Sequence, residues 1–586
     1  MLRRSMVACL FVLVLVLVLG PMPVLSRDLQ REPEAATGIA DKSLVTAKRH
    51  MVVAAHPLAA QAGREMLRQG GSAIDAAIAT QLVLGLVEPQ SSGLGGGAFI
   101  VHWQNAARGV TTFDGRETAP ASARPDRFIV NGAMMDFPDA VRSGLSVGVP
   151  GVIRAMELAH GKFGKRAWSE LFAPAIALAE EGFPLPARLH DLLKWEGAEA
   201  FAPEARRYFF NDDGTPKAAG TILKNPAYAE TLRAVASGGA KAFYEGAIAD
   251  AMVAAVAVAP IAKGDLTAAD LASYHAKERD ALCFPYRART LCGMGPPSSG
   301  AMTIAQTLKL IEPFSVIPGA DNAMRASALH VISEAEKLAY ADRNRYIADP
   351  DFVAVPDGLL DDTYIADRRK LIDIDTAMEK PNAGLPPGIA KRTFGKDATH
   401  EVAGTSHLSV VDDQGNAVAM TTTIEGAFGS HLWAAGFLLN NELTDFSLMP
   451  AGSDGLVAAN AVAGGKRPRS SMSPMLIFDS QGALEGVTGS PGGSRIIMFV
   501  TKTLVAMLDW GMDAQQAAAL PNFGSDGGAL TYEPSPSFAL NAVALKSYGH
   551  TLNAEYMTSG VHTILRRNGE LEGGADPRRE GVALGD

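Results

Sequence analysis

Apolar residues recur along most of the chain at spacings typical of helices and strands. A first amphipathic helix is expected to begin at Pro57 and to end before Gly70. Ser72 and Asp75 then have the spacing of a helix cap with its acidic partner, and the segment from there to Val87 is apolar on nearly every side. A helix without a polar face is expected to be buried.

Further helices and strands are predicted to alternate without a clean domain boundary. The helical patterns cover residues 151–162, 167–181, 226–237, 247–258, 300–312 and 322–347. Extended patterns cover residues 97–103, 109–114, 406–424, 435–439, 474–479 and 484–488, and a glycine-containing turn at 412–416 makes a hairpin within the densest group. Length alone suggests about four domains. The sequence has neither a fixed repeat nor a long linker after residue 48, which favours one mixed α/β body.

The N-terminal residues have the pattern of a segment that is removed from the mature protein. Arg3 and Arg4 precede an apolar run at 6–19, and small residues near position 26 offer a cleavage site. The run is shorter than the ~20 residues of a membrane-spanning helix, so a cleaved signal peptide (1–26) is preferred over an uncleaved anchor. A polar, flexible lead-in at 27–48 is expected to follow. The protein is therefore predicted to be exported, to the periplasm or outside the cell, without a stable membrane anchor.

Composition narrows the classes of function. With 47% hydrophobic and 20% charged residues in a chain of 586, a large core can form, and disorder is excluded for most of the chain. The 53 basic and 63 acidic residues give a net charge of −10, and no long basic run occurs. We therefore expect no nucleic-acid partner.

Of the three cysteines, Cys9 lies within the predicted signal peptide. Cys283 and Cys292 flank two short extended runs joined by a turn of proline and arginine, which could place them opposite each other in a hairpin. In an exported protein this spacing fits a disulfide and equally fits two buried thiols. No CxxC pair accompanies them and the histidines are scattered, so no metal site is predicted.

Two short motifs could supply a nucleophile. The GxSxG sequence at 144–148 is followed by an extended stretch, whereas a nucleophile elbow needs a helix directly after the serine. Thr405 instead stands at the head of the predicted hairpin, after Ala403 and Gly404, which can adopt the strained geometry of a self-cleaving bond. A threonine that is the first residue of a chain can use its own α-amine as the base.

A glycine-rich turn at 488–495 follows one of the later strands. Consecutive glycines let backbone N–H groups point toward a developing oxyanion without obstruction from a Cβ atom. On spacing alone the simpler interpretation is still favoured, in which Thr405 starts a hairpin and the glycines form an ordinary turn.

Motifs that occur together in one enzyme family are present here in the same order. They are HPLA at 56–59, GGSAIDAA at 70–77, EPQSSG at 88–93, RETAP at 116–120, PPSSG at 296–300, TSH at 405–407, LNNE at 439–442, DFS at 445–447, KRPRSSM at 466–472 and the turn at 488–495. On these motifs, from about residue 49 to 586, the chain resembles the γ-glutamyltransferases (γ-glutamyltranspeptidases, glutathione hydrolases).

The resemblance implies an N-terminal-nucleophile (Ntn) hydrolase fold, a four-layer αββα sandwich of the α/β (α+β) class. It implies that the precursor cleaves itself between Gly404 and Thr405. The products would be a large subunit (49–404, after the lead-in) and a small subunit (405–586), which stay together as an intertwined heterodimer. No metal or organic cofactor is expected.

The resemblance also assigns roles within the active site. Thr405 is the nucleophile, Thr423 is a second threonine that hydrogen-bonds to it, and Gly492 and Gly493 form the oxyanion hole. A γ-glutamyl group carries an α-carboxylate and an α-ammonium. Arg116 is expected to grip the carboxylate together with the hydroxyls of Ser470 and Ser471, and Glu442 and Asp445 are expected to take the ammonium.

Three departures from the family pattern bear on the substrate. Glu425 stands where many members have asparagine, which adds negative charge near the ammonium site. The stretch 448–465 is shorter than the lid of some bacterial members and has no tyrosine, and Ser406 follows the nucleophile where threonine is common. We expect a γ-glutamyl hydrolase/transferase that acts on glutathione and related compounds. The alternatives are an acylase for glutaryl-type (cephalosporin) or poly-γ-glutamate substrates, and an unprocessed, non-enzymatic binding relative.

Overall fold

The computed structural model describes residues 40–318, 324–389, 394–452 and 455–586. All of them belong to one compact unit. The predicted signal peptide and residues 27–39 of the predicted lead-in lie outside the described residues. The flexible lead-in was predicted to extend to residue 48, and this boundary is wrong because residues 45–47 form a strand. Strand β1 (Val45–Ala47) pairs antiparallel with β22 (Glu570–Ala575), because its β-branched residues suit an edge position of a sheet.

Two seven-stranded antiparallel sheets form the centre of the molecule. The first has the order β1, β22, β21 (His562–Arg567), β17 (Leu484–Thr488), β16 (Met475–Phe478), β11 (Arg289–Met294) and β10 (Ala281–Tyr286). The second has the order β23 (Val582–Gly585), β2 (Met51–Ala54), β12 (Ser406–Val411), β13 (Ala417–Thr423), β3 (Gly97–Gln104), β4 (Gly109–Gly115) and β9 (Lys277–Arg279). The two sheets pack face to face, with contacts such as those of β12 with β21 and β17.

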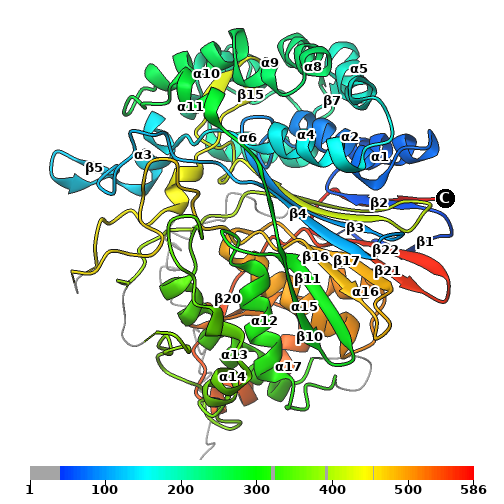
Figure 1. Cartoon of the computed structure of the whole chain (residues 1–586), viewed down its shortest axis with the longest axis vertical. Coiled ribbons are helices and arrows are strands. Elements are labelled where there is room, and N and C mark those ends of the chain that lie inside the picture. The colour runs from blue at the N-terminus through cyan, green and yellow to red at the C-terminus, as the bar shows by residue number, and fades with distance from the viewer. Residues whose placement is uncertain (1–39, 319–323, 390–393, 453–454) are drawn as a thin grey trace, which may run out of the picture. The chain divides into compact units, whose positions relative to one another are not determined.

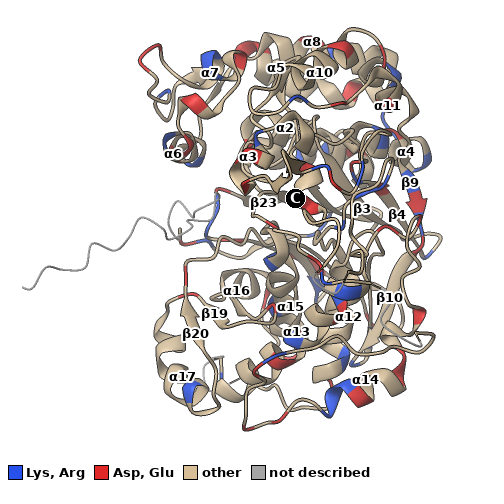
Figure 2. Ribbon diagram, turned by 90° about the vertical axis from the view of Figure 1, so that its left-hand side faces the viewer, with Lys and Arg blue, Asp and Glu red and all other residues tan. Residues whose placement is uncertain are grey.

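Helices cover the outer face of each sheet (Figure 1). The layer next to the second sheet contains α1 (Pro57–Arg68), α2 (Ala73–Val87), α4 (Val152–Phe163), α5 (Ala173–Glu181), α8 (Pro226–Gly238) and α10 (Ala247–Ala257). The layer next to the first sheet contains α12 (Gly300–Ile311), α13 (Ala326–Tyr346), α15 (Ile496–Leu508) and α16 (Ala514–Ala519). The predicted four-layer αββα sandwich is confirmed. Basic and acidic residues are interspersed over the helices of both layers (Figure 2).

Both faces of the central strands are buried, which explains why they are apolar runs without polar alternation. In β2, Val52 and Ala54 pack toward the first helical layer, while Met51 and Val53 pack into the core between the sheets. A shift of register by one residue would exchange the two cores, so the packing fixes the position of each strand.

The predicted helices agree with the structure to within a few residues. Ser72 and Asp75 form the expected capping box, in which the Ser72 hydroxyl accepts from the amide of Asp75 and the Asp75 carboxylate accepts from that of Ser72. The helix predicted at 167–181 is divided into a 3-10 turn (Trp168–Phe172) and α5, because Pro174 cannot donate a backbone hydrogen bond.

Two smaller sequence features are also resolved. Cys283 lies opposite Cys292 in the β10–β11 hairpin, and a disulfide joins them. Ser146 of the GxSxG sequence is buried in a 3-10 turn, and its hydroxyl donates to the backbone oxygen of Val141. It therefore has none of the exposure that a nucleophile elbow gives. In the described part of the chain, no helix combines the length and the apolar character needed to cross a membrane.

Candidate active site

The β12–β13 hairpin brings two threonines together. Thr405 directly precedes β12 and Thr423 ends β13, and the register pairs Ser406 with Thr422. The two strands lie in the middle of their sheet, between β2 and β3, so their ends are held rigidly. The hydroxyl of Thr405 donates to that of Thr423 over 3.2 Å, and both residues are buried.

The peptide bond before Thr405 lies within a network of polar contacts. The Thr423 hydroxyl is 3.5 Å from the carbonyl oxygen of Gly404 and accepts from the amide of Glu425 over 2.8 Å. Arg579 donates to the Thr405 carbonyl oxygen over 3.1 Å. A Cβ atom at Gly404 would lie 1.9 Å from the backbone oxygen of Glu425, so only glycine fits there.

The glycine-rich turn lies against the segment that precedes Thr405. Gly492 and Gly493 have φ values of 135° and 57°, which glycine adopts readily. A Cβ atom at Gly493 would lie 2.4 Å from the carbonyl oxygen of Val402. The turn can approach the backbone next to Thr405 this closely because it carries no side chain there.

Arg116 is 1% exposed and has many partners. Its guanidinium donates to Glu442, to Asp445 over 2.6 Å, and to the backbone oxygens of Pro468 over 3.2 Å and Arg469 over 2.8 Å. The residues expected to bind opposite charges of a substrate therefore pair with one another in this structure.

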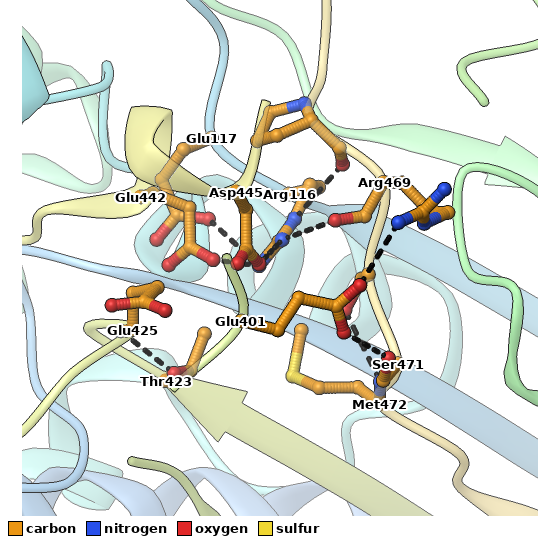
Figure 3. Close-up of polar contacts among 12 residues, drawn as sticks. Arg116, Glu117, Glu401, Thr423, Glu425, Glu442, Asp445, Arg469, Ser471 and Met472 are labelled. Carbon is orange, nitrogen blue, oxygen red and sulfur yellow. Dashed lines mark hydrogen bonds and ion pairs between the residues drawn. The ribbon is translucent and has the colours of Figure 1, made fainter. Parts of the chain in front are cut away.

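Three carboxyl groups, those of Glu117, Glu442 and Asp445, surround this single guanidinium, and Glu425 lines the same pocket (Figure 3). Burial raises the pKa of Glu117 to about 7 and that of Asp445 to about 6, although Arg116 opposes both shifts. Burial also raises the pKa values of Glu425 and Glu442 well above their usual range, with smaller contributions from neighbouring carboxylates. Glu117 was not predicted as a site residue, although it adjoins Arg116 in the RETAP motif.

Ser470 and Ser471 reach the same pocket from the other side. The Ser470 hydroxyl accepts from the amide of Met472 over 3.2 Å. The Ser471 hydroxyl donates to the carboxylate of Glu401 over 2.7 Å and accepts from Arg343 over 2.5 Å. Neither Glu401 nor Arg343 was predicted as a site residue.

Glu401 lies four positions before Thr405 in the sequence and is the first acidic residue on that side. Its carboxylate also accepts from Arg343 over 2.6 and 2.8 Å and from Arg469 over 2.9 Å. Burial would raise the pKa of Glu401, but the two guanidinium groups outweigh it and lower the pKa to about 2. The carboxylate is therefore ionised, and Figure 3 shows it facing Arg469 and Ser471.

One pocket joins these residues. Its lining consists of Arg116, Glu401, Val402, Gly404, Thr405, Thr423, Glu425, Glu442, Asp445, Ser470, Ser471, Met472, Gly493 and Ile496. Of the predicted site residues, only Gly492 is outside this set, next to Gly493. The pocket thus combines a threonine hydroxyl, the backbone of a glycine-rich turn and charges of both signs.

Three residues of the kinds that bind metals lie together outside this pocket. Two of them are on α13, and the third is near the C-terminal end of the chain. His330, Glu334 and His550 are buried and close together. His330 Nδ1 is 2.7 Å from His550 Nε2, and the Glu334 carboxylate accepts from Lys337 over 2.8 Å and from the amide of Met378 over 2.7 Å. The two histidines pair with each other, and Glu334 pairs with Lys337 and Met378, so we interpret the group as a polar core cluster.

A model of the γ-glutamyltranspeptidase family matches residues 59–586. The chain belongs to the γ-glutamyltranspeptidase family. The glutathione hydrolase proenzyme of Bacillus subtilis (strain 168) is 34% identical over 597 residues, which cover 100% of this chain and 99% of the relative. The protein of the same name from Escherichia coli (strain K12) is 36% identical over 545 residues, with 91% of each chain covered.

Solved structures share the fold of this γ-glutamyltranspeptidase family member. The crystal structure of cephalosporin acylase from Bacillus halodurans superimposes with a TM-score of 0.80 at 26% identity, and covers 95% of this chain and 99% of its own. The predicted resemblance and the predicted Ntn-hydrolase fold class are both confirmed.

Proposed function

We propose that this protein is a self-processing γ-glutamyl hydrolase and transferase with Thr405 as its nucleophile. The observation that carries the proposal is the Thr405–Thr423 hydroxyl pair, 3.2 Å apart and beside the Gly404 carbonyl, in a pocket that holds charges of both signs. Relatives named glutathione hydrolase proenzyme support the same reaction and its processing.

Self-cleavage begins with attack of the Thr405 hydroxyl oxygen on the carbonyl carbon of Gly404. The Thr423 hydroxyl accepts the Thr405 proton and donates its own hydrogen toward the Gly404 oxygen. The C–N bond then breaks, the nitrogen of Thr405 leaves as an amine, and water hydrolyses the resulting ester to a Gly404 carboxylate and a free Thr405 hydroxyl. Thr405 has a φ of 157°, rare for a residue with a side chain, and relief of this strain favours the cleavage.

Turnover of a substrate repeats this chemistry with the new α-amine of Thr405 as the base. The hydroxyl attacks the γ-carbonyl of the donor, the amine carries the proton to the leaving group, and a γ-glutamyl ester remains on Thr405. Water or the amine of an amino acid or peptide resolves this ester. Backbone N–H groups of Gly492 and Gly493 stabilise the oxyanion of each step.

The charges of the pocket match those of a γ-glutamyl donor. The α-ammonium binds among Glu425, Glu442 and Asp445, while Arg116 with Ser470 and Ser471 serves the α-carboxylate. A zwitterion adds one charge of each sign, so it can join the Arg116 cluster and exchange ion pairs without leaving a buried charge uncompensated.

The test of the nucleophile is the Thr405→Ala variant, analysed by mass spectrometry. Wild-type protein is expected to give two chains, one ending at Gly404 and one beginning at Thr405. The alanine variant is expected to remain one chain. Thr405→Ser, which keeps a hydroxyl, is the matched control and should still be cleaved. An alanine variant that is cut at the same bond would contradict self-cleavage by Thr405. An intact wild-type chain would favour a non-enzymatic binding protein.

A second candidate is an acylase for glutaryl-type amides, favoured by the similarity to a solved cephalosporin acylase. A glutaryl group has no ammonium to pair with Glu442 and Asp445. Hydrolysis rates of γ-glutamyl-p-nitroanilide and glutaryl-p-nitroanilide separate the two functions, and we expect the γ-glutamyl compound to be the better substrate. A preference for the glutaryl compound would favour the acylase.

We also propose that the protein is exported through its N-terminal segment, which is removed after about residue 26. The basic start and the apolar run at 6–19 support this. N-terminal sequencing of protein from the exported fraction, with the full-length chain in the cell as reference, tests it. An uncleaved N-terminus on exported protein would contradict removal of the segment.

A further inference from the structure

Arg579 is a buried cation that contacts the residue proposed as the nucleophile. It belongs to the turn between β22 and β23, and it is 2% exposed. Its guanidinium donates to the carbonyl oxygen of Thr405 over 3.1 Å, to that of Ser559 over 3.2 Å and to that of Thr558 over 3.4 Å. The guanidinium is thus held by three backbone oxygens, and one of them belongs to Thr405.

The turn that carries Arg579 is itself held in place. The ammonium of Lys42 donates to the backbone oxygens of Asp576 over 2.8 Å and of Arg579 over 2.7 Å, and also to that of Gly581. At Gly560 a Cβ atom would lie 2.8 Å from Cδ of Arg579, so the absence of a side chain there gives the arginine its room. The guanidinium therefore has a defined position beside the nucleophile.

The contact lies on the side of the proposed cleavage that stays in place. Thr405 is followed by Ser406, the first residue of β12, which pairs with Thr422 of β13. Cleavage creates an α-amine on the same residue whose carbonyl oxygen Arg579 holds. The nitrogen and the carbonyl oxygen of one residue are about 3 Å apart by standard bond lengths, so the guanidinium lies within about 6 Å of the new amine.

The carboxyl groups of the pocket favour the protonated form of this amine. Those that share the pocket with Thr405 belong to Glu401, Glu425, Glu442 and Asp445. Arginines pair with Glu401, Glu442 and Asp445 and offset part of their charge. A carboxylate beside an amine raises the pKa of the amine. The ordinary pKa of an α-amine is about 7.7–8.0, so without a further cation this one would be mostly protonated at pH 7.

The ionisable groups on the neighbouring strands and loops add little net charge near the amine. Burial lowers the pKa of His407 well below its usual range and that of His562 to about 3, so neither ring is charged at pH 7. Glu88 forms an ion pair with Arg188 over 3.1 Å and accepts from the Ser406 hydroxyl over 2.9 Å.

The other charges around the turn either have partners or act in the same direction as Arg579. Asp576 accepts from Arg578 over 2.9 Å, and Glu580 accepts from a backbone amide over 3.3 Å. Burial lowers the pKa of Lys42 to about 8, so its ammonium is still mostly charged at pH 7. Its contacts are with the turn, whereas the guanidinium of Arg579 contacts the nucleophile.

We propose that Arg579 is a positioning residue that keeps the α-amine of cleaved Thr405 neutral at pH 7, so that this amine can act as the base. The inference rests on the proposed function, which it deepens. The neutral amine accepts the proton of the Thr405 hydroxyl while the oxygen attacks the γ-carbonyl carbon, and the resulting ammonium gives that proton to the leaving nitrogen. Arg579 gains and loses no proton. Its positive charge disfavours the ammonium form before the donor binds.

The first experiment measures the pKa of the α-amine. Cleaved wild-type protein is treated with a trace of acetic anhydride at pH values from about 5 to 9, and hydroxylamine then removes any acetyl ester. Mass spectrometry of the peptide that begins at Thr405 gives the extent of acetylation, which follows the neutral fraction of the amine. We expect a pKa at least about one unit below the ordinary value. The same protein in denaturant is the reference and should give the ordinary value. A folded protein that titrates at or above it would overturn the inference.

Variants of Arg579 test whether its charge causes the shift. Arg579→Gln is expected to raise the pKa of the amine by at least about one unit, and Arg579→Lys, which keeps a charge, should retain part of the wild-type shift. Arg207→Gln is the matched control, because the Arg207 side chain is 70% exposed, and it should change nothing. Equal pKa values in the wild type and in Arg579→Gln would overturn the role of Arg579.

A variant that fails to cleave itself, which a denaturing gel shows, is made in a second way. Its two chains are produced together, and the small chain is released at Thr405 from a leader that a protease removes. The amine then exists without self-cleavage, and the same labelling gives its pKa.

The second experiment tests the consequence for turnover. The acid limb of the pH profile of kcat reports the base in the enzyme–substrate complex, whereas protonation of Asp445 is expected to act on KM. With γ-glutamyl-p-nitroanilide at saturation, kcat of Arg579→Gln should fall severalfold at pH 7 and approach that of the wild type at pH 9. A loss of kcat by the same factor at every pH would indicate a merely structural role and overturn the inference.

These measurements separate the inference from the proposed function. A wild-type chain that stays uncleaved has no α-amine at Thr405 and would contradict both. Cleaved wild-type protein without γ-glutamyl activity would contradict the function, while the labelling would still measure the effect of Arg579 on the amine. An active enzyme whose α-amine has its ordinary pKa would contradict only the inference.

Discussion

At the scale of single residues, the protonation of the pocket is expected to change close to neutral pH. Burial raises the pKa of Asp445 to about 6, so this carboxyl is ionised above that value and neutral below it. A neutral carboxyl cannot form an ion pair with the donor ammonium. About one tenth of Asp445 is ionised at pH 5, so we expect KM for a γ-glutamyl donor to rise about tenfold between pH 7 and pH 5.

The measurement is KM as a function of pH for the wild type and for Asp445→Asn. The asparagine variant should have a high KM that changes much less over this interval, because it has no carboxyl at this position to protonate. If both proteins show the same rise, another group controls donor binding and the role of Asp445 is contradicted. Thermal unfolding at each pH verifies that both proteins stay folded over the interval.

The sequence predicted most residues that the pocket brings together, and it did so through motifs far apart in the chain. Thr405 and Gly493 could be named because each lies in a motif with a chemical reason, and Thr423 because the family resemblance assigns it. Glu401 and Arg343 could not, because their significance lies in a contact between segments 58 residues apart that only the folded chain creates. The pairing of Arg116 with Glu442 and Asp445 likewise arises only in the folded chain.

At the scale of secondary structure, the cap of α2 connects local sequence to tertiary packing. The Asp75 carboxylate accepts from the amide of Ser72 over 2.8 Å, and also from those of Lys165 and Arg166 over 2.9 and 3.1 Å. The Ser72 hydroxyl accepts only from the amide of Asp75 among the contacts described. Asp75 therefore caps the helix and also fixes the loop after α4.

We expect Asp75→Ala to destabilise the protein more than Ser72→Ala does. Loss of an N-cap hydroxyl costs about 1 kcal/mol, whereas loss of a buried carboxylate with three amide partners should cost about 3 kcal/mol or more. Melting temperatures recorded at one scan rate show which of the two variants is less stable. The control is Ser547→Ala at an exposed position, whose free energy of unfolding should stay within about 0.5 kcal/mol of that of the wild type. Equal effects of the two cap variants would show that the contacts to the loop contribute little.

Several helices with a clear cap or an amphipathic face were predicted, whereas others, such as the capped helix α16, were missed. The segment Ile496–Leu508 was missed as a helix because it is a short apolar run rich in isoleucine, valine and threonine, a composition that suits a buried strand equally. Strand β1 was missed because three residues carry too little periodicity, and its pairing with β22 depends on a segment more than 500 positions away.

At the scale of the whole molecule, the proposed cleavage site lies inside one folding unit. In the second sheet β12 and β13, which follow Thr405, lie between β2 and β3, which precede it. The first sheet likewise joins β11 to β16 and β1 to β22. The four domains suggested by chain length are therefore replaced by a single sandwich, to which residues on both sides of Thr405 contribute strands of each sheet.

This interleaving predicts that cleavage leaves the two chains associated. Separation would break the backbone pairing of β12 with β2 and of β13 with β3, and would expose both buried cores to water. In native size-exclusion chromatography the cleaved wild type and the uncleaved Thr405→Ala variant are expected to elute at the same volume.

Denaturant alone should separate the chains of the cleaved protein, without a reducing agent. The disulfide described here joins Cys283 to Cys292, and both lie before Thr405. If the cleaved protein dissociated on simple dilution, the prediction that the shared sheets hold the two chains together would be wrong. If a reductant were needed to separate the chains, a covalent link would join them. Because each chain alone would present unpaired strand edges and half of a core, neither is expected to fold when produced without the other.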